Sequence, residues 1–419
     1  MPLSEKSGFY YGYRIVAATF LCTFIWSGSG FYAFSLFIKP LQMGLGWNRG
    51  EIMIALTLWF LVNAVASLPV GKMVDRYGAR KVISTGAIIG GLGFVFLSLM
   101  NDLWHFYISY AVVGAGTAAA GAIPATTVVS NWFKKRRGTA IGVTSIGVGG
   151  GGFVMAPLLG GYLIPHFGWR VAYRVLALLI WIIIIPLALF VIKAKPADTG
   201  HCSENVEPAP DIIPDRVSSS ADARFTLRMA LATSALWLAI ISFWSNAFSH
   251  VSTIQSQVPY LSDIGFPVAI AATALGGIGL ASAVAKITFG WLCDRVPVKF
   301  AVCTGLSLQL IGIILMINLG PASPPTQLWL YTVVMGFGAG SWLPTMSMLI
   351  STNFGISAYG AIFGMVSFAF FFGGAIGPLV AGYMYDATGT YRSAFVIFAA
   401  LYVVAIPVIL AIRRPRLPA

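Results

Sequence analysis

The chain has 419 residues, of which 58% are hydrophobic and 9% are charged, and its mean hydropathy is +0.84. A soluble domain carries about 25% charged residues and needs far more polar surface, so a large soluble protein is excluded. The net charge of +13 does not indicate a nucleic-acid partner, because the basic residues stand in short loops between apolar runs. The composition therefore predicts a protein embedded in a lipid bilayer.

Twelve apolar runs follow a short polar arm at the N-terminus. Each meets or approaches the ~20 residues that a helix needs to cross the hydrocarbon of a bilayer. The stretch 193–227 is rich in Pro, Ser, Asp and Glu and is predicted to be a flexible linker. It divides the chain into an N-terminal bundle of six helices, 1–192, and a C-terminal bundle of six, 228–419. The runs cover residues 13–38, 49–69, 81–100, 103–130, 137–163, 170–192, 228–258, 268–290, 300–319, 326–350, 359–384 and 393–412.

The basic residues are distributed unevenly between the two sides of these runs. Alternate loops and both tails hold 20 of the 26 Lys and Arg residues, and Lys286 lies inside an apolar run. This bias predicts that both termini and the linker lie in the cytoplasm, with the protein in a bacterial inner membrane. The five basic residues of the opposite side are Lys39, Arg49, Arg170, Arg174 and Arg392.

Cysteine usage and motif content bear on enzyme chemistry. The four cysteines, at positions 22, 202, 293 and 303, show no metal-ligand or disulfide spacing. No cleavable signal peptide is evident at the N-terminus. The chain offers no nucleophile–base cluster, phosphate loop or metal-ligand set, so no enzyme activity, cofactor or metal is expected. A membrane-bound enzyme or sensor is the alternative from another class, and no sizeable soluble domain supports it.

A charge-dense loop at residues 71–81, GKMVDRYGARK, connects the second and third runs. Gly71 permits close approach of two helices, Asp75 can lie near a helix N-terminus, and Gly78 permits a left-handed turn. The flanking cations that mark the cytoplasmic side include Arg76 and Arg80.

A related loop, GWLCDRVPVK, returns about half a chain later with Gly290, Asp294 and Arg295. A loop repeated once per half predicts a duplicated bundle with a ligand site near the bilayer midplane. The densest glycine run, GVGGGGF at residues 147–153, has two interpretations, close helix packing and a hinge.

The pattern Gly-x-x-x-Asp-Arg-x-Gly-x-Arg-Lys matches the loop between helices 2 and 3 of the major facilitator superfamily in full. The second copy keeps the Gly, Asp and Arg but has Pro297 and Val298 where the turn glycine and its neighbour would stand. The chain is similar to this superfamily over nearly its whole length. The resemblance implies an all-α membrane protein of twelve transmembrane helices in two pseudo-symmetric six-helix bundles, working as a monomer.

Shorter strings resemble the monocarboxylate transporters and their bacterial relatives, including the oxalate–formate exchangers. They are YYGYR before the first run, FIKPL and GWNR around the first loop, and NWFKKRRG before the fifth run. This resemblance implies a secondary transporter of small organic anions, most simply monocarboxylates, with proton symport or anion exchange. Its partners would be a carboxylate substrate, protons and the lipid bilayer. The alternative is an exporter or importer of a larger or neutral molecule.

In that family an arginine on helix 8 holds the substrate carboxylate, four residues before the glycine of the second loop. Lys286 occupies that position here. A charge at membrane depth is costly unless it faces water or a partner, which favours a functional role. The alternative is a lysine that extends to the cytoplasmic edge of the bilayer. Lysine also replaces the bidentate fork of arginine by a point charge.

None of the thirteen acidic residues lies in the middle of a predicted span. Animal members of the family carry an Asp one turn before the helix-8 arginine, tied to proton coupling, and a lysine on helix 1. Those positions are Ser282 and Leu36 here. Proton symport would therefore need another titratable group, for which His250 is the candidate. A satisfied structural histidine is the alternative, and without His250 anion exchange or uniport is simpler.

Other polar and aromatic residues are expected on helices 1, 2, 7, 10 and 11, which line the cavity in this fold. Aromatic rings shape pockets and polar groups orient ligands, whereas packing or an interfacial belt is the alternative for each residue alone. The substrate-binding candidates among them are Tyr32, Asn63, Asn246 and Trp342, followed by Trp26, Trp244, Gln255 and Ser367.

Overall fold

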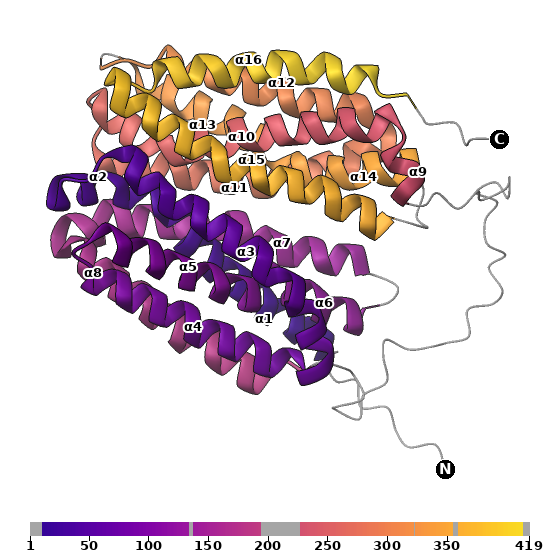
Figure 1. Ribbon diagram of the computed structural model, residues 1–419, viewed down its shortest axis with the longest axis horizontal. Coiled ribbons are helices and arrows are strands. Elements are labelled where there is room, and N and C mark those ends of the chain that lie inside the picture. The colour runs from indigo at the N-terminus through magenta and orange to yellow at the C-terminus, as the bar shows by residue number, and fades with distance from the viewer. Residues whose placement is uncertain (1–10, 134–136, 194–226, 322, 355–358, 414–419) are drawn as a thin grey trace, which may run out of the picture.

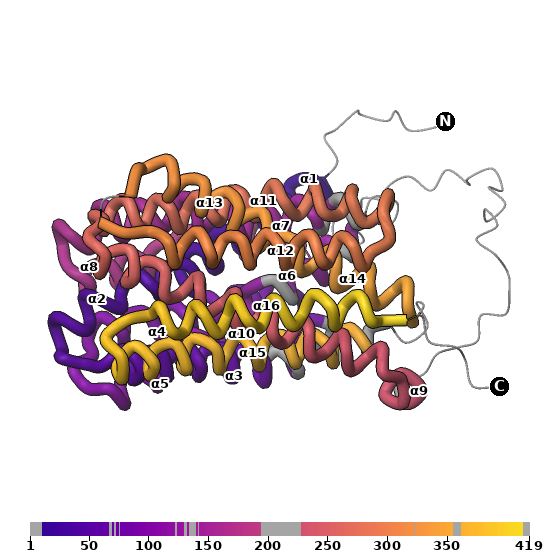
Figure 2. Tube along the Cα trace, turned by 90° about the horizontal axis from the view of Figure 1, so that it is seen from above, coloured from indigo at the N-terminus to yellow at the C-terminus, as the bar shows by residue number. Residues whose placement is uncertain are grey.

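The computed structural model describes residues 11–133, 137–193, 227–321, 323–354 and 359–413. Every regular element among these residues is helical, which confirms the predicted all-α class. Figure 1 shows two stacked groups of helices, the N-terminal half in indigo to magenta and the C-terminal half in red to yellow. Figure 2, turned by 90°, shows that the helices of both halves run side by side along one common direction.

The N-terminal half begins with one continuous helical span that contains a π-helical segment, η1. The remaining spans of this half are single helices or runs of consecutive helical elements. Its elements are α1 (Tyr11–Trp26), η1 (Ser27–Tyr32), α2 (Ala33–Leu45), α3 (Arg49–Tyr77), α4 (Ala79–Leu99), α5 (Leu103–Ala120), α6 (Ala122–Trp132), α7 (Arg137–Pro157), η2 (Leu158–Leu163), α8 (Ile164–Leu179), η3 (Ile180–Ile184) and η4 (Leu187–Val191).

The C-terminal half begins with a short helix and continues with longer ones. Its elements are α9 (Leu227–Leu231), α10 (Ser234–Asp263), α11 (Val268–Arg295), α12 (Val298–Ile317), α13 (Pro325–Gly340), α14 (Trp342–Phe354), α15 (Tyr359–Thr388) and α16 (Arg392–Ala411).

Ten stretches of the described residues are long and apolar enough to cross a membrane. One of them, Gly142–Val191, has 50 residues, and it turns at Gly168, where φ is 77°, so that it provides two crossings. The remaining crossing is α10, whose 30 residues are long enough but rich in Ser, Thr and Gln and mostly buried. The twelve-helix prediction is thereby confirmed.

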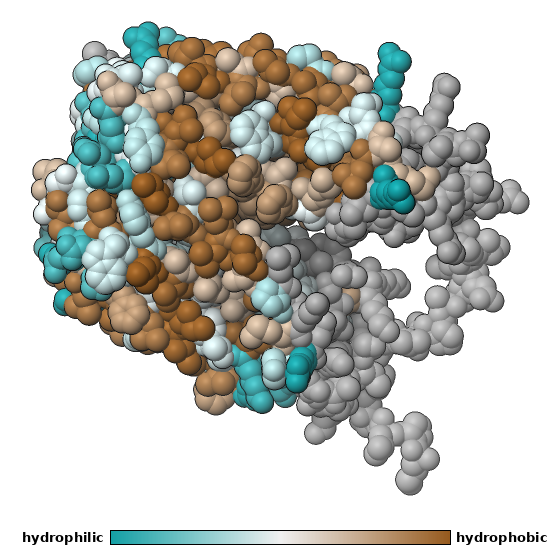
Figure 3. Space-filling view, viewed as in Figure 1, coloured by the Kyte–Doolittle hydropathy of each residue, from teal (hydrophilic) through white to brown (hydrophobic). Residues whose placement is uncertain are grey.

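The surface agrees with a bilayer environment. Large apolar side chains such as Ile182, Phe190 and Ile287 are exposed on the outside of the helices. Figure 3 shows hydrophobic residues across the middle of the visible face and hydrophilic residues gathered at its ends. This arrangement places apolar groups against lipid tails and polar groups at the two interfaces.

Some element boundaries differ from the predicted ones. The predicted run 228–258 is interrupted after α9, and α10 begins behind Thr233, whose hydroxyl accepts the N–H of Leu236 at 3.4 Å. The first run extends to Leu45, well beyond the predicted end at residue 38. Most of the predicted linker, residues 194–226, lies outside the described part of the chain, and the linker stays a prediction.

The two halves meet along three lines of contact: α7 and its continuation η2 pack on α11, α3 packs on α15, and α2 packs on α10. At one end of the bundle Gly50 and Gly382 lie so close that a Cβ on Gly382 would be 2.9 Å from the Cα of Gly50. We call this end, at the start of α3, the Arg49 end. The opposite end, where α3 finishes, is called the Arg76 end.

Candidate functional site

The centre of the first span has a wider helical turn than its flanks. Residues Ser27–Tyr32 form η1, a π-helical segment inside an otherwise α-helical span. Such segments leave backbone groups free for partners outside the helix, and they occur often at functional sites. Here Gln255 of α10 donates from Nε2 to the carbonyl of Phe31 at 3.0 Å. The contact joins the two halves in the middle of the bundle.

Aromatic rings surround this central contact on the N-terminal side. The ring of Tyr32 lies against Gly152, and a Cβ there would be 2.7 Å from ring atoms. Tyr32 is 6% exposed and stands edge-on to Phe31 at 5.2 Å. Phe31 in turn meets Phe60 of α3 at 6.4 Å. Tyr32 is therefore packed between α7 and its own helix, and its part in substrate binding stays a prediction.

Lys286 lies on α11 and reaches across the boundary between the halves. Its ammonium donates to the carbonyl of Ser145 on α7 at 3.2 Å, and the side chain is half-buried. The ammonium is thus directed toward the N-terminal half. Ser282, one turn earlier on the same helix, is 6% exposed.

Two further predicted residues lie one turn apart on α10, which places them on one face of that helix. Asn246 is 3% exposed and His250 is 8% exposed. The Oδ1 atom of Asn246 and the Nδ1 atom of His250 have no hydrogen-bond partner among the described residues, and the same holds for Oγ of Ser367 on α15. Buried polar atoms without partners are costly in a finished core, and each of them calls for a water, an ion or a ligand.

The remaining substrate-binding candidates are less constrained. Trp342 stacks on Phe370 of α15 with ring centroids 4.4 Å apart. Asn63 is half-buried in α3. Within the described residues no hydrogen bond or ion pair joins Lys286 to His250. The candidates therefore lie on helices of both halves without forming one connected polar cluster. No group of three or more His, Cys, Asp or Glu that could hold a metal ion occurs in the described residues.

The predicted loop motifs lie at the Arg76 end. Gly78 has φ 84°, a positive value that favours glycine, but its ψ of 146° lies outside the αL region, so the turn differs from the predicted left-handed one. Arg76, Arg80, Asp294 and Arg295 are exposed, and neither ion pair found among the described residues involves them. Gly290 has open space around it. The surroundings of Gly71 and the side chain of Asp75 lie outside what the structure describes, so that a gating role of the loops stays a prediction.

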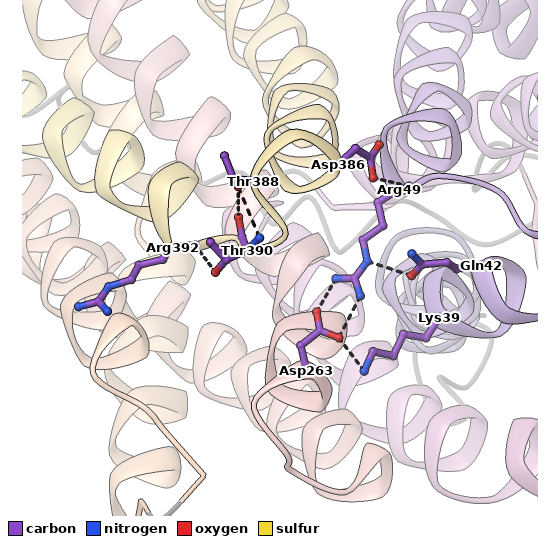
Figure 4. A network of polar contacts seen from close by, with 8 residues as sticks. All are labelled: Lys39, Gln42, Arg49, Asp263, Asp386, Thr388, Thr390 and Arg392. Carbon is purple, nitrogen blue, oxygen red and sulfur yellow. Dashed lines mark hydrogen bonds and ion pairs between the residues drawn. The ribbon is translucent and has the colours of Figure 1, made fainter.

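Sequence reasoning missed the most densely connected polar group of the described residues, at the Arg49 end (Figure 4). Arg49 is 2% exposed and donates to both carboxylate oxygens of Asp263, at 2.7 and 3.0 Å. Its guanidinium lies 3.7 Å from the ring centroid of Tyr385 and 5.2 Å from that of Tyr391. Burial raises the pKa of Tyr391 to about 12, so the phenol beside Arg49 stays neutral.

The sequence held a signal for this cluster. Lys39 and Arg49 stand among the few basic residues on the side that the positive-inside rule leaves poor in charge. A basic residue on that side needs a reason other than topology. The acidic partner of both, Asp263, is more than two hundred residues away in the chain, and no local pattern connects them.

Comparisons with known proteins agree with this fold. A family model described as Major Facilitator Superfamily matches residues 17–279 and 247–419. Human monocarboxylate transporter 11 is 28% identical over 82% of this chain and 72% of its own length. Mouse monocarboxylate transporter 12 is 24% identical over 97% of this chain and 88% of its own.

Two solved structures show the same fold at low identity. A bacterial homolog of the human lysosomal transporter Spinster, inward-facing and unoccupied, has a TM-score of 0.73 and 17% identity over 99% of this chain and 100% of that one. The nucleoside transporter NupG has a TM-score of 0.74 and 14% identity over 96% of this chain and 99% of its own.

Proposed function

The chain belongs to the Major Facilitator Superfamily, and on that premise we propose that it moves small organic anions, most simply monocarboxylates, by alternating access. It is a multi-pass membrane transporter and not an enzyme. Its relatives named monocarboxylate transporters support the cargo class. The two halves would rock about a central site, opening it to one side of the membrane at a time.

Lys286 is the observation that carries the proposal. It is the basic residue within an apolar run, and its ammonium bonds the Ser145 carbonyl in the other half at 3.2 Å. An ammonium has three donors, so that a carboxylate can bind it while the carbonyl contact remains. Because this cation lies between the halves, an anion that binds it changes the interactions of both halves. The orphaned polar atoms of Asn246 and His250 then serve the rest of the substrate.

We infer the orientation and the coupling from the charges. The Arg76 end, with its exposed cations, lies in the cytoplasm. Coupling is by proton symport through His250 or by exchange of one anion for another. A pH gradient imposed across proteoliposomes separates these two mechanisms, because only symport is driven by it, whereas exchange requires an anion inside the vesicle.

The proposal is tested by uptake of labelled lactate, pyruvate, formate and oxalate into proteoliposomes. Lys286→Met keeps the length of the side chain and removes its charge. A hydrogen bond to a charged group contributes about 1.5–3 kcal/mol, so we expect affinity for the transported carboxylate to fall by roughly 10- to 100-fold. Lys286→Arg keeps the charge and should retain part of the uptake.

Lys299 supplies the matched control. Its ammonium also donates to a backbone carbonyl, that of Ile412, but within the C-terminal half. We expect Lys299→Met to transport carboxylates as the parent does. Equal carboxylate uptake by Lys286→Met and the parent would end the assigned role of Lys286. Uptake of neutral compounds in place of all four anions would support the alternative cargo.

A further inference from the structure

Two basic side chains of the N-terminal half converge on one carboxylate of the C-terminal half at the Arg49 end (Figure 4). Arg49 binds Asp263 through both terminal nitrogens, and Nζ of Lys39 lies 2.8 Å from Oδ1 of Asp263. Gln42, also in the N-terminal half, accepts from Nε of Arg49 at 3.1 Å. All the donors come from one half and the carboxylate comes from the other.

The three N-terminal residues have the composition of a carboxylate receptor. A guanidinium fork binds a carboxylate in two parallel hydrogen bonds, and an adjacent ammonium adds a point charge. The bond from Arg49 to Gln42 fixes the direction of the fork from within the same half. A free carboxylate can therefore make the contacts that Asp263 makes, without any change on the N-terminal side.

We propose that Lys39, Gln42 and Arg49 form an outer carboxylate-binding site, filled by Asp263 while this end is closed and by a substrate carboxylate once the halves separate. The inference rests on the proposed function for the class of the cargo and for the orientation, in which the Arg49 end faces the outside. This site is distinct from the Lys286 site, because Arg49 begins α3 at the end of the bundle and Lys286 bonds α7 further along.

Charge balance explains why an anion is needed there. The carboxylate of Asp386 accepts the backbone N–H groups of Arg49 at 3.0 Å and Gly50 at 2.7 Å, at the first residues of α3. Separation of the halves removes this carboxylate together with Asp263. The N-terminal half then keeps two cations and the positive end of a helix without their counter-charges.

The remaining acidic group of this segment does not replace them. The carboxylate of Glu51 is engaged by the backbone N–H of Asn48 at 2.8 Å, within the same helix start. An external anion that binds only the separated state shifts the equilibrium toward that state. Asp263 and the external carboxylate are then competitors for one receptor. The side chains of Lys39 and Asp263 are 27% and 26% exposed, so that an anion can approach the ammonium first.

A cysteine reporter tests the competition. Thr57 of α3 is half-buried and donates to the carbonyl of Ala375 on α15 at 2.6 Å, so that its hydroxyl lies against the other half in the closed state. Thr57→Cys is placed in a background in which the four native cysteines are replaced by serine. Labelling by a membrane-impermeant maleimide from the outside then measures the separation of the halves. Acetate is the probe anion, and sodium chloride of equal ionic strength replaces it in the reference.

We expect acetate to raise the labelling rate of the reporter severalfold. Asp263→Asn should label rapidly without acetate, because the competing charge is gone. Arg49→Lys keeps the charge but loses the fork for Asp263 and for acetate alike, so that labelling without acetate should rise and the fold increase caused by acetate should fall. Arg170→Lys is the matched control on the same side, since its guanidinium bonds Asn101 within the N-terminal half at 2.7 Å. Its acetate response should equal that of the reporter parent.

The anion site is overturned if acetate does not change the labelling rate of the reporter parent while the Asp263→Asn variant labels rapidly. Asp263 would then be a closing contact only. If Asp263→Asn does not fold, the Lys39→Gln variant tests the site instead. Loss of the ammonium should reduce the increase in labelling rate that acetate causes, and an unchanged increase overturns the site. Carboxylate uptake without an acetate response rejects the outer site alone. An acetate response without carboxylate uptake rejects the proposed cargo alone.

Discussion

Gly149 on α7 and Gly279 on α11 face each other across the boundary between the halves, with no room for a side chain on either. A Cβ on Gly279 would lie only 2.5 Å from the carbonyl oxygen of Gly149, and one on Gly149 would lie closer still to that of Gly279. Within the same glycine run, Gly152 packs against the ring of Tyr32. Close packing therefore accounts for these glycines, and a hinge role stays a prediction.

The first prediction concerns substitution of these glycines. Gly149→Ala forces a methyl group into the backbone of α11, and overpacking of this kind costs about 1–3 kcal/mol. Gly142→Ala is the matched control on the same helix, because a Cβ there meets nothing within 4 Å. Since alanine is the better helix former by roughly 0.5–1 kcal/mol, the control should be slightly stabilised. Thermal unfolding in detergent measures both, and the same sign for the two changes would contradict the prediction.

The second prediction separates two neighbouring glutamines of α10. Gln255 bonds the Phe31 carbonyl in the other half, whereas Oε1 of Gln257 accepts from the Tyr331 hydroxyl within the C-terminal half, at 2.9 Å. Gln255→Met should favour separation and raise external labelling of the Thr57→Cys reporter by about 2- to 10-fold, the equivalent of one neutral hydrogen bond. Gln257→Met should leave that labelling unchanged while lowering the thermal midpoint. Equal labelling of the two variants would show that the Phe31 contact does not hold the halves together.

The fold was predictable because hydropathy and length determine what can cross a bilayer. The break before α10 at Thr233 and the π-helical turn of Ser27–Tyr32 were not. Both depend on local hydrogen bonds, a hydroxyl cap in one case and a shifted backbone register in the other. A hydropathy pattern predicts which side chains are buried, and it contains no information about such hydrogen bonds.

The candidate site was predicted unevenly for a similar reason. Lys286 could be found because a charge inside an apolar run is conspicuous in the sequence. Arg49 was conspicuous only as a basic residue on the side that is poor in them, and nothing in the sequence identified Asp263, at the end of another span, as its partner. Only the fold brings Asp263 to Arg49, and pairing across the two halves leaves no trace in local spacing.

The third prediction tests a buried hydrogen bond inside the C-terminal half. The hydroxyl of Tyr402 on α16 donates to Oε1 of Gln309 on α12 at 2.8 Å, and both residues are fully buried. Tyr402→Phe leaves the glutamine oxygen without that donor, which should cost about 1–3 kcal/mol of stability. Tyr162→Phe, at a residue 53% exposed, should cost almost nothing. Thermal midpoints in detergent decide, and an unchanged midpoint for Tyr402→Phe would show that another donor replaces the hydroxyl.

The fourth prediction compares two carboxylates that serve the start of α3. Asp386 accepts the N–H groups of Arg49 and Gly50 from the other half, whereas Glu51 accepts the N–H of Asn48 within its own helix. Asp386→Ala removes contacts that exist only while the halves are closed, so external labelling of the Thr57→Cys reporter should rise by about 10-fold or more.

Glu51→Ala removes a capping contact that persists whether or not the halves separate. It should lower the thermal midpoint, by the equivalent of about 0.5–2 kcal/mol, and leave labelling of the reporter as it was. If the two alanine variants changed labelling equally, the Asp386 contact would have no special part in closing the bundle. An increase in the labelling rate that is confined to Asp386→Ala would show that the start of α3 is capped from the opposite half. The capping of its first turn would then depend on whether this end is closed.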